Sequence, residues 1–337
     1  MKATTPVARW TWGRDHDAGS SVAACLHELF TAYAVLSEHR LMVGTPRVSV
    51  SVHEAGVKNT YLFQGGFEPE ATSPPADAAA ELAERIEASM RPGEIGSVYA
   101  GASSGGEVVI GNDTHEEADL FRLGASTLFD YISVDLVTHT DVWLPYDLKG
   151  WPQPEVCASN GPRLSAALRD LSEALDSETD PDDPTYFAKP NETGAANFFD
   201  ENANALDVWG SFEVPYRHGM FTQTPGFGRI GYRRTVEGDV RYVPVKDDRG
   251  DVLGYLWVSD SEPAASFEPQ DVGDDTVYQA GLIWLQRLRS AYDRGLSPAA
   301  ALVELSAMPD EKGAGHVDPT SEPRTAALTA LRDREAG

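Results

Sequence analysis

Cysteine is nearly absent from this sequence, with only Cys25 and Cys157 among 337 residues. Two cysteines allow one disulfide at most, which excludes a disulfide framework and a paired-cysteine zinc knuckle. Long apolar runs are also absent, since no stretch approaches the roughly 18–20 residues that a membrane-spanning helix needs. The first residues, MKATTPVARWTWGRDHD, have no apolar core and no small-residue cleavage pattern. We therefore expect no secretory signal and a cytoplasmic location.

Basic side chains are scarce. The chain has 27 Lys and Arg against 53 Asp and Glu, which gives a formal net charge of −26. Nucleic-acid binding depends on cations that neutralise phosphates, and anionic membrane surfaces repel an acidic chain as well. We therefore expect no direct nucleic-acid binding and no membrane binding. A basic protein partner would be steered towards this chain, although the charge alternatively serves only solubility.

Hydrophobic residues make up 41% of the sequence, enough for folded cores, and 337 residues exceed what one core usually organises. The patterns predict an α+β fold with two domains, each an antiparallel β-sheet with helices packed on one face. The expected divisions are a first domain at 1–178, an acidic proline-containing linker at 179–200, a β-meander with helices at 201–310, and a loosely attached tail at 311–337.

Hydrophobic periodicity places the elements of both domains. The predicted helices cover 21–38, 78–90, a segment that starts at Pro162 with Asn160 as its cap, 275–294 and 298–305. The predicted strands cover 47–53, 57–63, 96–100, 107–111, 126–139, 207–214, 228–235, 240–245 and 252–259. Gly295 and Ser297 are suitable boundary residues between the last two helices.

No motif has convincing catalytic or cofactor spacing. The string Gly101–Ala102–Ser103–Ser104–Gly105 matches the Gly-x-Ser-x-Gly pattern of a nucleophile elbow. That elbow needs a strand-to-helix turn, whereas this string is predicted to join two strands. The segment TPGFGRIG lacks the Lys–Ser/Thr pair of a phosphate-binding loop. We therefore predict no catalytic residue, no cofactor and no metal.

Four side chains nevertheless offer an alternative. His115, Glu117, His139 and Asp141 have nitrogen and oxygen atoms that bind metal ions, and their convergence would make a metal-dependent hydrolase. Nothing in their spacing demands that they converge. The simpler interpretation is that they are solvated residues near strand ends.

Aromatic and acidic residues occur together in two segments, 141–151 and 180–201. Aromatic anchors rimmed by carboxylates are typical of an interface for a basic protein. The predicted partner-binding residues are Trp143, Tyr146, Asp147, Trp151, Asp180, Asp182, Asp183, Phe198, Phe199, Asp200 and Glu201. The alternative is that tryptophans such as Trp143 and Trp209 fill the domain cores.

Three segments carry a resemblance to a known class of proteins. The meander VRYVPVKDDRGDVLGYLWVSD and the helix GLIWLQRLRSAYDRGLSPAAAL resemble small α+β proteins of actinobacteria that are encoded beside secreted toxin genes, and DVWLPYDLKGWPQ shares the pattern. The resemblance implies an immunity protein, which binds and neutralises a cognate toxin. We therefore expect a stoichiometric inhibitor that occludes the active site of a basic toxin domain, and not an enzyme. A scaffold or phage-type accessory protein is a third alternative.

Overall fold

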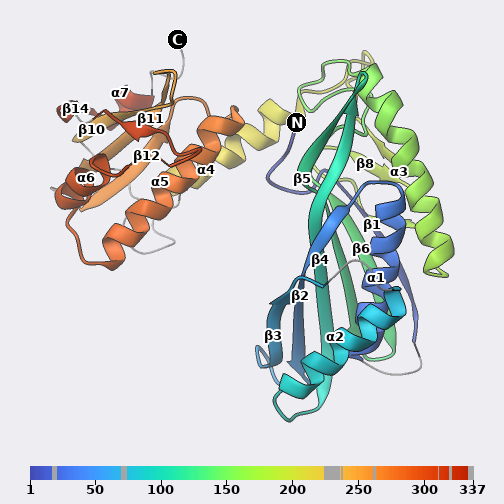
Figure 1. Cartoon of the computed structure of the whole chain (residues 1–337). Helices are drawn as coiled ribbons and strands as arrows, with labels where there is room; N and C mark the ends of the chain where they lie inside the picture. The colour runs from blue at the N-terminus through green and yellow to red at the C-terminus, as the bar shows by residue number, and fades with distance from the viewer. Residues whose placement is uncertain are drawn as a thin grey trace. The chain divides into compact units, whose positions relative to one another are not determined.

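The computed structural model describes residues 1–16, 21–69, 74–223, 236, 238–259, 261, 263–309, 311–318 and 321–332. The chain divides into two compact units, Met1–Trp209 and Gly210–Gly337. Each unit has its own sheet and its own hydrophobic core (Figure 1). The described strand pairings are antiparallel and helices pack against both sheets, which confirms the predicted α+β class. Among the described residues, no helix combines the length and apolarity needed to cross a membrane.

Unit 1 is built on a seven-stranded sheet with the order β3-β2-β4-β5-β6-β1-β7. Its strands are β1 (Ala8–Asp15), β2 (Val43–Glu54), β3 (Tyr61–Phe67), β4 (Ile95–Ile110), β5 (Asp113–Leu128), β6 (Tyr131–Thr138) and β7 (Asp180–Pro181). A separate hairpin joins β8 (Lys189–Asn191) to β9 (Gly194–Ala196). Buried residues alternate with more exposed ones along the central strands, so one face of the sheet is covered and the other is open.

Three helices cover the buried face of this sheet (Figure 1). They are α1 (Val22–Glu38), α2 (Pro75–Ser89) and α3 (Pro154–Ala174). Ser21 caps α1, because its Oγ accepts a hydrogen bond from the N–H of Ala24. The predicted helix at 21–38 is therefore confirmed, and its apolar stripe packs against β4 and β5.

Two predicted strand boundaries in unit 1 are wrong. The strands expected at 96–100 and 107–111 belong to one continuous strand, β4, because the Ser/Gly-rich stretch between them pairs with β5 instead of turning. The single strand expected at 126–139 is a hairpin that turns at Phe129, whose φ is 55°. Serine and glycine composition indicated a turn, but pairing on both sides holds this stretch extended.

The third helix begins earlier than predicted, at Pro154, and continues through Pro162. Asn160 is buried inside it and does not act as a cap. Its Nδ2 donates to the carbonyl of Val109 at 2.8 Å, and its Oδ1 accepts from the N–H of Val109 at 3.0 Å. This amide therefore ties α3 to β4, a contact that local sequence does not indicate.

The segment predicted as a linker, 179–200, is folded into unit 1. Strand β7 pairs with β1, with Trp10 opposite Pro181. The Nε1 of Trp10 donates to the carbonyl of Asn191 at 2.9 Å, and the hydroxyl of Thr185 donates to the carbonyl of Val7 at 2.8 Å. The acidic, proline-rich composition predicted a linker. The segment is instead ordered by pairing with residues near the N-terminus, in and beside β1.

Unit 2 contains a smaller sheet with the order β12-β11-β10-β13, and β14 also pairs with β10. Its strands are β10 (Asp239–Lys246), β11 (Val252–Ser259), β12 (Ala264–Pro269), β13 (His316–Val317) and β14 (Arg324–Ala327). Its helices are α4 (Val214–Gln223), α5 (Asp275–Asp293), α6 (Pro298–Ser306) and α7 (Leu328–Arg332). Helices α5 and α6 pack on the sheet, and Asp274 and Ser297 cap them through their side chains.

Two predictions for unit 2 are wrong and one lies outside the described residues. The segment 207–214, predicted as a strand, forms a π-helical turn (Trp209–Glu213) that leads into α4. The predicted tail is packed where it is described, because β13 and β14 pair with β10 and both Leu328 and Leu331 are buried. The strand predicted at 228–235 falls among residues that are not described.

Candidate functional site

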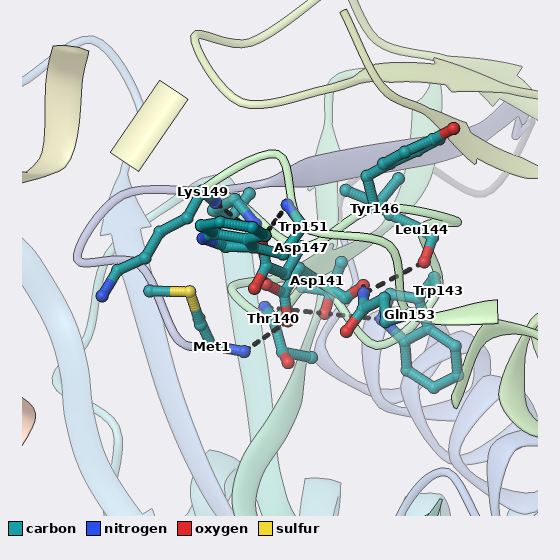
Figure 2. Close-up of polar contacts among 12 residues, drawn as sticks. Met1, Thr140, Asp141, Trp143, Leu144, Tyr146, Asp147, Lys149, Trp151 and Gln153 are labelled. Carbon is teal, nitrogen blue, oxygen red and sulfur yellow. Dashed lines mark hydrogen bonds and ion pairs between the residues drawn. The ribbon is translucent and has the colours of Figure 1, made fainter. Parts of the chain in front are cut away.

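The predicted site segment 141–151 is organised around the carboxylate of Asp141, a residue with no exposed surface. Its Oδ2 accepts a hydrogen bond from the N–H of Leu148 at 3.0 Å, and its Oδ1 pairs with the ammonium group of Met1. Figure 2 shows Asp141 between Met1 and the loop that follows it. Burial raises the pKa of Asp141, against the opposing effect of the ammonium group.

The backbone of Asp141 is held as firmly as its side chain. Its carbonyl accepts from the Nε2 of Gln153 at 2.7 Å, and the same nitrogen donates to the carbonyl of Leu144 at 3.0 Å. Gln153 was not among the predicted site residues, because nothing in its spacing relates it to Asp141. The hydrogen bonds of both residues serve to hold the loop in shape.

Trp143 lies in the core of unit 1 and not on a binding surface. It is 3% exposed, its ring centre lies 5.2 Å from that of Phe121, and its Nε1 donates to the hydroxyl of Thr138 at 3.1 Å. The expectation that Trp143 contacts a partner is therefore corrected. An indole whose N–H has a buried acceptor is a stable core residue.

Among the residues that the structure describes, three five-residue loops share one hydrogen-bonding pattern, with an aspartate first in each. The Oδ1 of that aspartate accepts from the N–H groups two and four residues later, and its own N–H donates to the carbonyl four residues later. The loops begin at Asp147, Asp200 and Asp247. The fourth residue has a positive φ in each, namely Gly150 at 81°, Ala203 at 63° and Gly250 at 91°. Two aspartates predicted to contact a partner, Asp147 and Asp200, thus use one carboxylate oxygen to rigidify their own loops.

The loop that begins at Asp147 also packs closely on a neighbouring segment, whereas the glycine of the loop that begins at Asp247 has open space around it. A Cβ added at Gly150 would lie 2.8 Å from the carbonyl oxygen of Ala205, whereas one added at Gly250 would meet nothing within 4 Å. Gly250→Ala should cost about 1–2 kcal/mol for the left-handed backbone alone. Gly150→Ala should cost more, because the added Cβ would also clash with the carbonyl oxygen of Ala205. Denaturant unfolding read by amide hydrogen exchange in each unit measures both, and equal costs would contradict the packing argument.

Two exposed aromatic side chains lie in or next to these rigid loops. Trp151 is 68% exposed and Phe199 is 48% exposed. The ring of Tyr146 meets that of Phe199 edge-on at 5.7 Å between centres, and Tyr146 and Trp151 leave their loop in different directions (Figure 2). The side chain of Asn197, which was not predicted, joins the two segments through hydrogen bonds to the N–H and carbonyl of Tyr146 at 3.1 and 2.9 Å. We call Tyr146, Trp151, Phe199 and the exposed Glu201 the loop surface.

The remaining predicted residues also lie in unit 1. Asp180 is exposed on the edge strand β7, and Asp183 is exposed just beyond it. A carboxylate oxygen of Asp182 lies 3.9 Å from the guanidinium of Arg9. Phe198 is half-buried, with the ammonium of Lys189 at 4.9 Å from its ring centre. The three aspartates lie on or beside β7, whereas Phe198 directly precedes Phe199 of the loop surface.

The four candidate metal ligands do not gather. His115 is exposed on β5, and the carboxylate of Glu117 lies 3.8 Å from the ammonium of Lys2. His139 is buried, with its Nδ1 at 3.3 Å from the carbonyl oxygen of Ala3, and Asp141 has the partners given above. Across the described ranges, no three His, Cys, Asp or Glu side chains are close enough to hold a metal ion.

The candidate nucleophiles are one serine and two cysteines, and their surroundings do not favour reaction. Ser103, the serine of the Gly-x-Ser-x-Gly string, lies within the extended strand β4 and not at a strand-to-helix turn. Both cysteines are free thiols. Burial raises the pKa of Cys25 to about 12 and also raises the pKa of Cys157. A reactive cysteine needs the opposite shift.

Comparison with known proteins adds no assignment to this geometry, since no family model, curated protein or solved structure shows significant similarity to the chain.

Proposed function

We propose that this chain is a stoichiometric inhibitor of the immunity type, which binds a basic toxin domain in the cytoplasm and covers its active site. The observation that carries the proposal is the loop surface, where Trp151 and Phe199 are exposed, and half-buried Tyr146 packs against Phe199, beside loops held by Asp147 and Asp200. Large exposed aromatic groups are the residues most often responsible for binding energy in protein interfaces.

The rigidity of these loops supports the same proposal. A loop that is already ordered loses less conformational entropy when it binds, so more of the contact energy remains as affinity. The N–H of Trp151 donates to Asp147 at 2.8 Å, and the N–H of Asn204 donates to Asp200 at the same distance. Both loops are therefore fixed next to the aromatic groups that they present.

The charge of the chain supports a cationic partner. A net charge of −26 attracts a positively charged protein at long range and raises its association rate at low salt. Glu201 is exposed beside Asp200 and adds a carboxylate to the loop surface itself. A nuclease or another toxin that binds an anionic substrate has a basic cleft of the complementary sign.

The test is binding to the protein encoded by the neighbouring gene, measured by calorimetry with purified full-length chains. Trp151→Ala should weaken binding by about 30-fold or more, because losing an interface tryptophan costs about 2 kcal/mol or more. Phe129→Ala is the matched control, since Phe129 is an aromatic residue that is 74% exposed at the β5–β6 turn, outside the loop surface. This control should leave affinity unchanged.

Salt provides a second measurement. Raising the ionic strength should slow association with wild-type protein, and Glu201→Gln should reduce that dependence. Absence of binding to the neighbouring product, or an equal loss in the Trp151 and Phe129 variants, would refute the proposal. Self-association of the wild-type chain through Trp151 would instead favour a scaffold.

A further inference from the structure

The open face of the unit 1 sheet contains a hollow of about 720 Å³, away from the loop surface. It lies over β2, β4 and β5, which are adjacent in the sheet. Hollows of this size fall in the range of about 300–1,000 Å³ that is typical of small-molecule sites. Its polar and aromatic lining residues include Arg47, Ser103, Arg122, Tyr99 and one exposed carboxylate, that of Glu68.

Two arginines stand in one row across the hollow. Arg47 on β2 pairs in register with Ser103 on β4, and Ser103 pairs with Arg122 on β5. Because neighbouring strands are about 4.8 Å apart, the two arginines begin about 10 Å apart, with the Ser103 hydroxyl between them. Arg47 is 69% exposed, and its nearest carboxylate, that of Asp119, is at 3.9 Å.

Arg122 has no ion-pair partner among the described residues. The chain has 27 basic residues against 53 acidic ones, so acceptors for a guanidinium group are plentiful. An arginine that faces a hollow without a carboxylate partner retains its capacity to bind an external anion. Guanidinium groups bind carboxylates and phosphates through paired N–H donors.

The next row forms a floor with little side chain. Ser49, Gly101 and Gly124 lie side by side on β2, β4 and β5. Packing within the protein explains the glycine at position 124, since a Cβ there would collide with the carboxylate of Asp135. At Gly101 the conflict is smaller, because a Cβ there would lie 3.3 Å from the Ser49 hydroxyl and 3.6 Å from the Tyr99 ring. A glycine inside a strand often marks the close approach of a ligand.

An aromatic ring completes the hollow on the side away from Arg47 and Arg122. The side chain of Tyr99 lies near both glycines of the floor and is 46% exposed. Asp135 lies beyond Gly124, outside the lining of the hollow, and its carboxylate is 3.7 Å from the guanidinium of Arg9. The guanidinium of Arg122, which has no ion-pair partner in the described part of the chain, therefore places the anionic group of a ligand at the arginine row, and the uncharged body then lies beside the Tyr99 ring.

We propose that this hollow, the arginine groove, binds a small organic anion, with a phosphate or carboxylate held between Arg47, Ser103 and Arg122 and a flat apolar body over Gly101. This binding site is independent of the proposed interface. The geometry selects one negative group at one end of the ligand, because the aromatic ring of Tyr99 lies at the other end.

Phenyl phosphate and phenylacetate are suitable probes, since each joins a ring to one of the two anionic groups, and benzyl alcohol is the uncharged control. Titration of the full chain at constant ionic strength, followed by the amide signals of Gly101 and Ser103, measures site-specific affinity. Arg122→Gln should weaken binding about tenfold, which corresponds to the loss of one charge-assisted interaction. Stronger binding of one probe assigns the phosphate or the carboxylate.

Two further variants test the geometry. Arg289→Gln removes an exposed arginine from α5 in unit 2 and should leave affinity unchanged. Gly101→Val keeps both arginines but fills the floor, and should weaken binding of both probes about tenfold while the protein stays folded by circular dichroism. The proposal is overturned if neither probe shifts these signals at millimolar concentration, if benzyl alcohol binds equally well, or if Arg289→Gln has the same effect as Arg122→Gln.

Discussion

Arg217→Met is expected to destabilise unit 2 by about 3–5 kcal/mol, because it leaves a buried carboxylate without its cation. Arg217 on α4 is almost wholly buried, and its Nε donates to the carboxylate of Glu213 at 2.7 Å, a residue with no exposed surface. The same guanidinium lies 2.7 Å from the carboxylate of Asp275 and 4.5 Å from the ring centre of Tyr278. One side chain therefore links α4 to the first turn of α5.

Two control variants separate the buried charge from the lost packing. Asp275→Asn removes the other, 58% exposed carboxylate and should cost less than about 1 kcal/mol. Glu213→Gln combined with Arg217→Met should recover at least half of the loss, since no charge is then left buried. Amide hydrogen exchange in α4 and α5 at increasing urea reads unit 2 separately from unit 1. A loss no larger than that of Asp275→Asn would contradict the assigned role.

Asp141→Ala is expected to destabilise unit 1 by about 2–4 kcal/mol. The change leaves the N–H of Leu148 and the ammonium of Met1 without their buried acceptor. The loop surface should loosen together with the core, because Leu148 lies inside the loop that Asp147 rigidifies. Exchange rates of the amides at 144–151 and the unfolding free energy of unit 1 report the two effects.

Asp141→Asn is the informative comparison for this residue. Asparagine keeps an oxygen acceptor for Leu148 but carries no charge, so its cost should be smaller than that of alanine.

Burial raises the pKa of Asp141, so the folded state binds its proton more tightly than the unfolded state. The stability contributed by this group is therefore present below its unfolded pKa of about 3.9 and is lost as pH rises through the folded pKa. The asparagine variant should lack that pH dependence, and equal costs of Asn and Ala would indicate that Leu148 does not need the acceptor.

The candidate site was only partly predictable from sequence. The density of aromatic and acidic residues in 141–151 correctly marked a loop with an exposed tryptophan, Trp151. The same density gave no means of distinguishing Trp151 from Trp143, which is in the core. Trp143 differs from Trp151 because its N–H donates to the hydroxyl of Thr138 and its ring packs against Phe121. The spacing of these residues in the sequence does not indicate either contact.

The arginine groove shows the same limit more clearly. Arg47, Gly101 and Arg122 are far apart in sequence and have no motif in common. The antiparallel order β2-β4-β5 and its register bring them into neighbouring rows on one face. A shift of one residue in either register would send one of these side chains to the covered face.

The sequence by itself determined the features that depend on neighbours within a few residues. Side-chain caps at Ser21, Asp274 and Ser297 begin helices where they were predicted, and apolar runs on either side of the turn at 247–251 mark β10 and β11. Tertiary structure alone decided that β4 runs unbroken, that 179–200 is part of a unit, and that Asp141 supports a loop and not a metal. The reason is that caps and periodicity act over one or two turns of chain, whereas strand pairing and buried hydrogen bonds join residues whose separation in sequence carries no pattern.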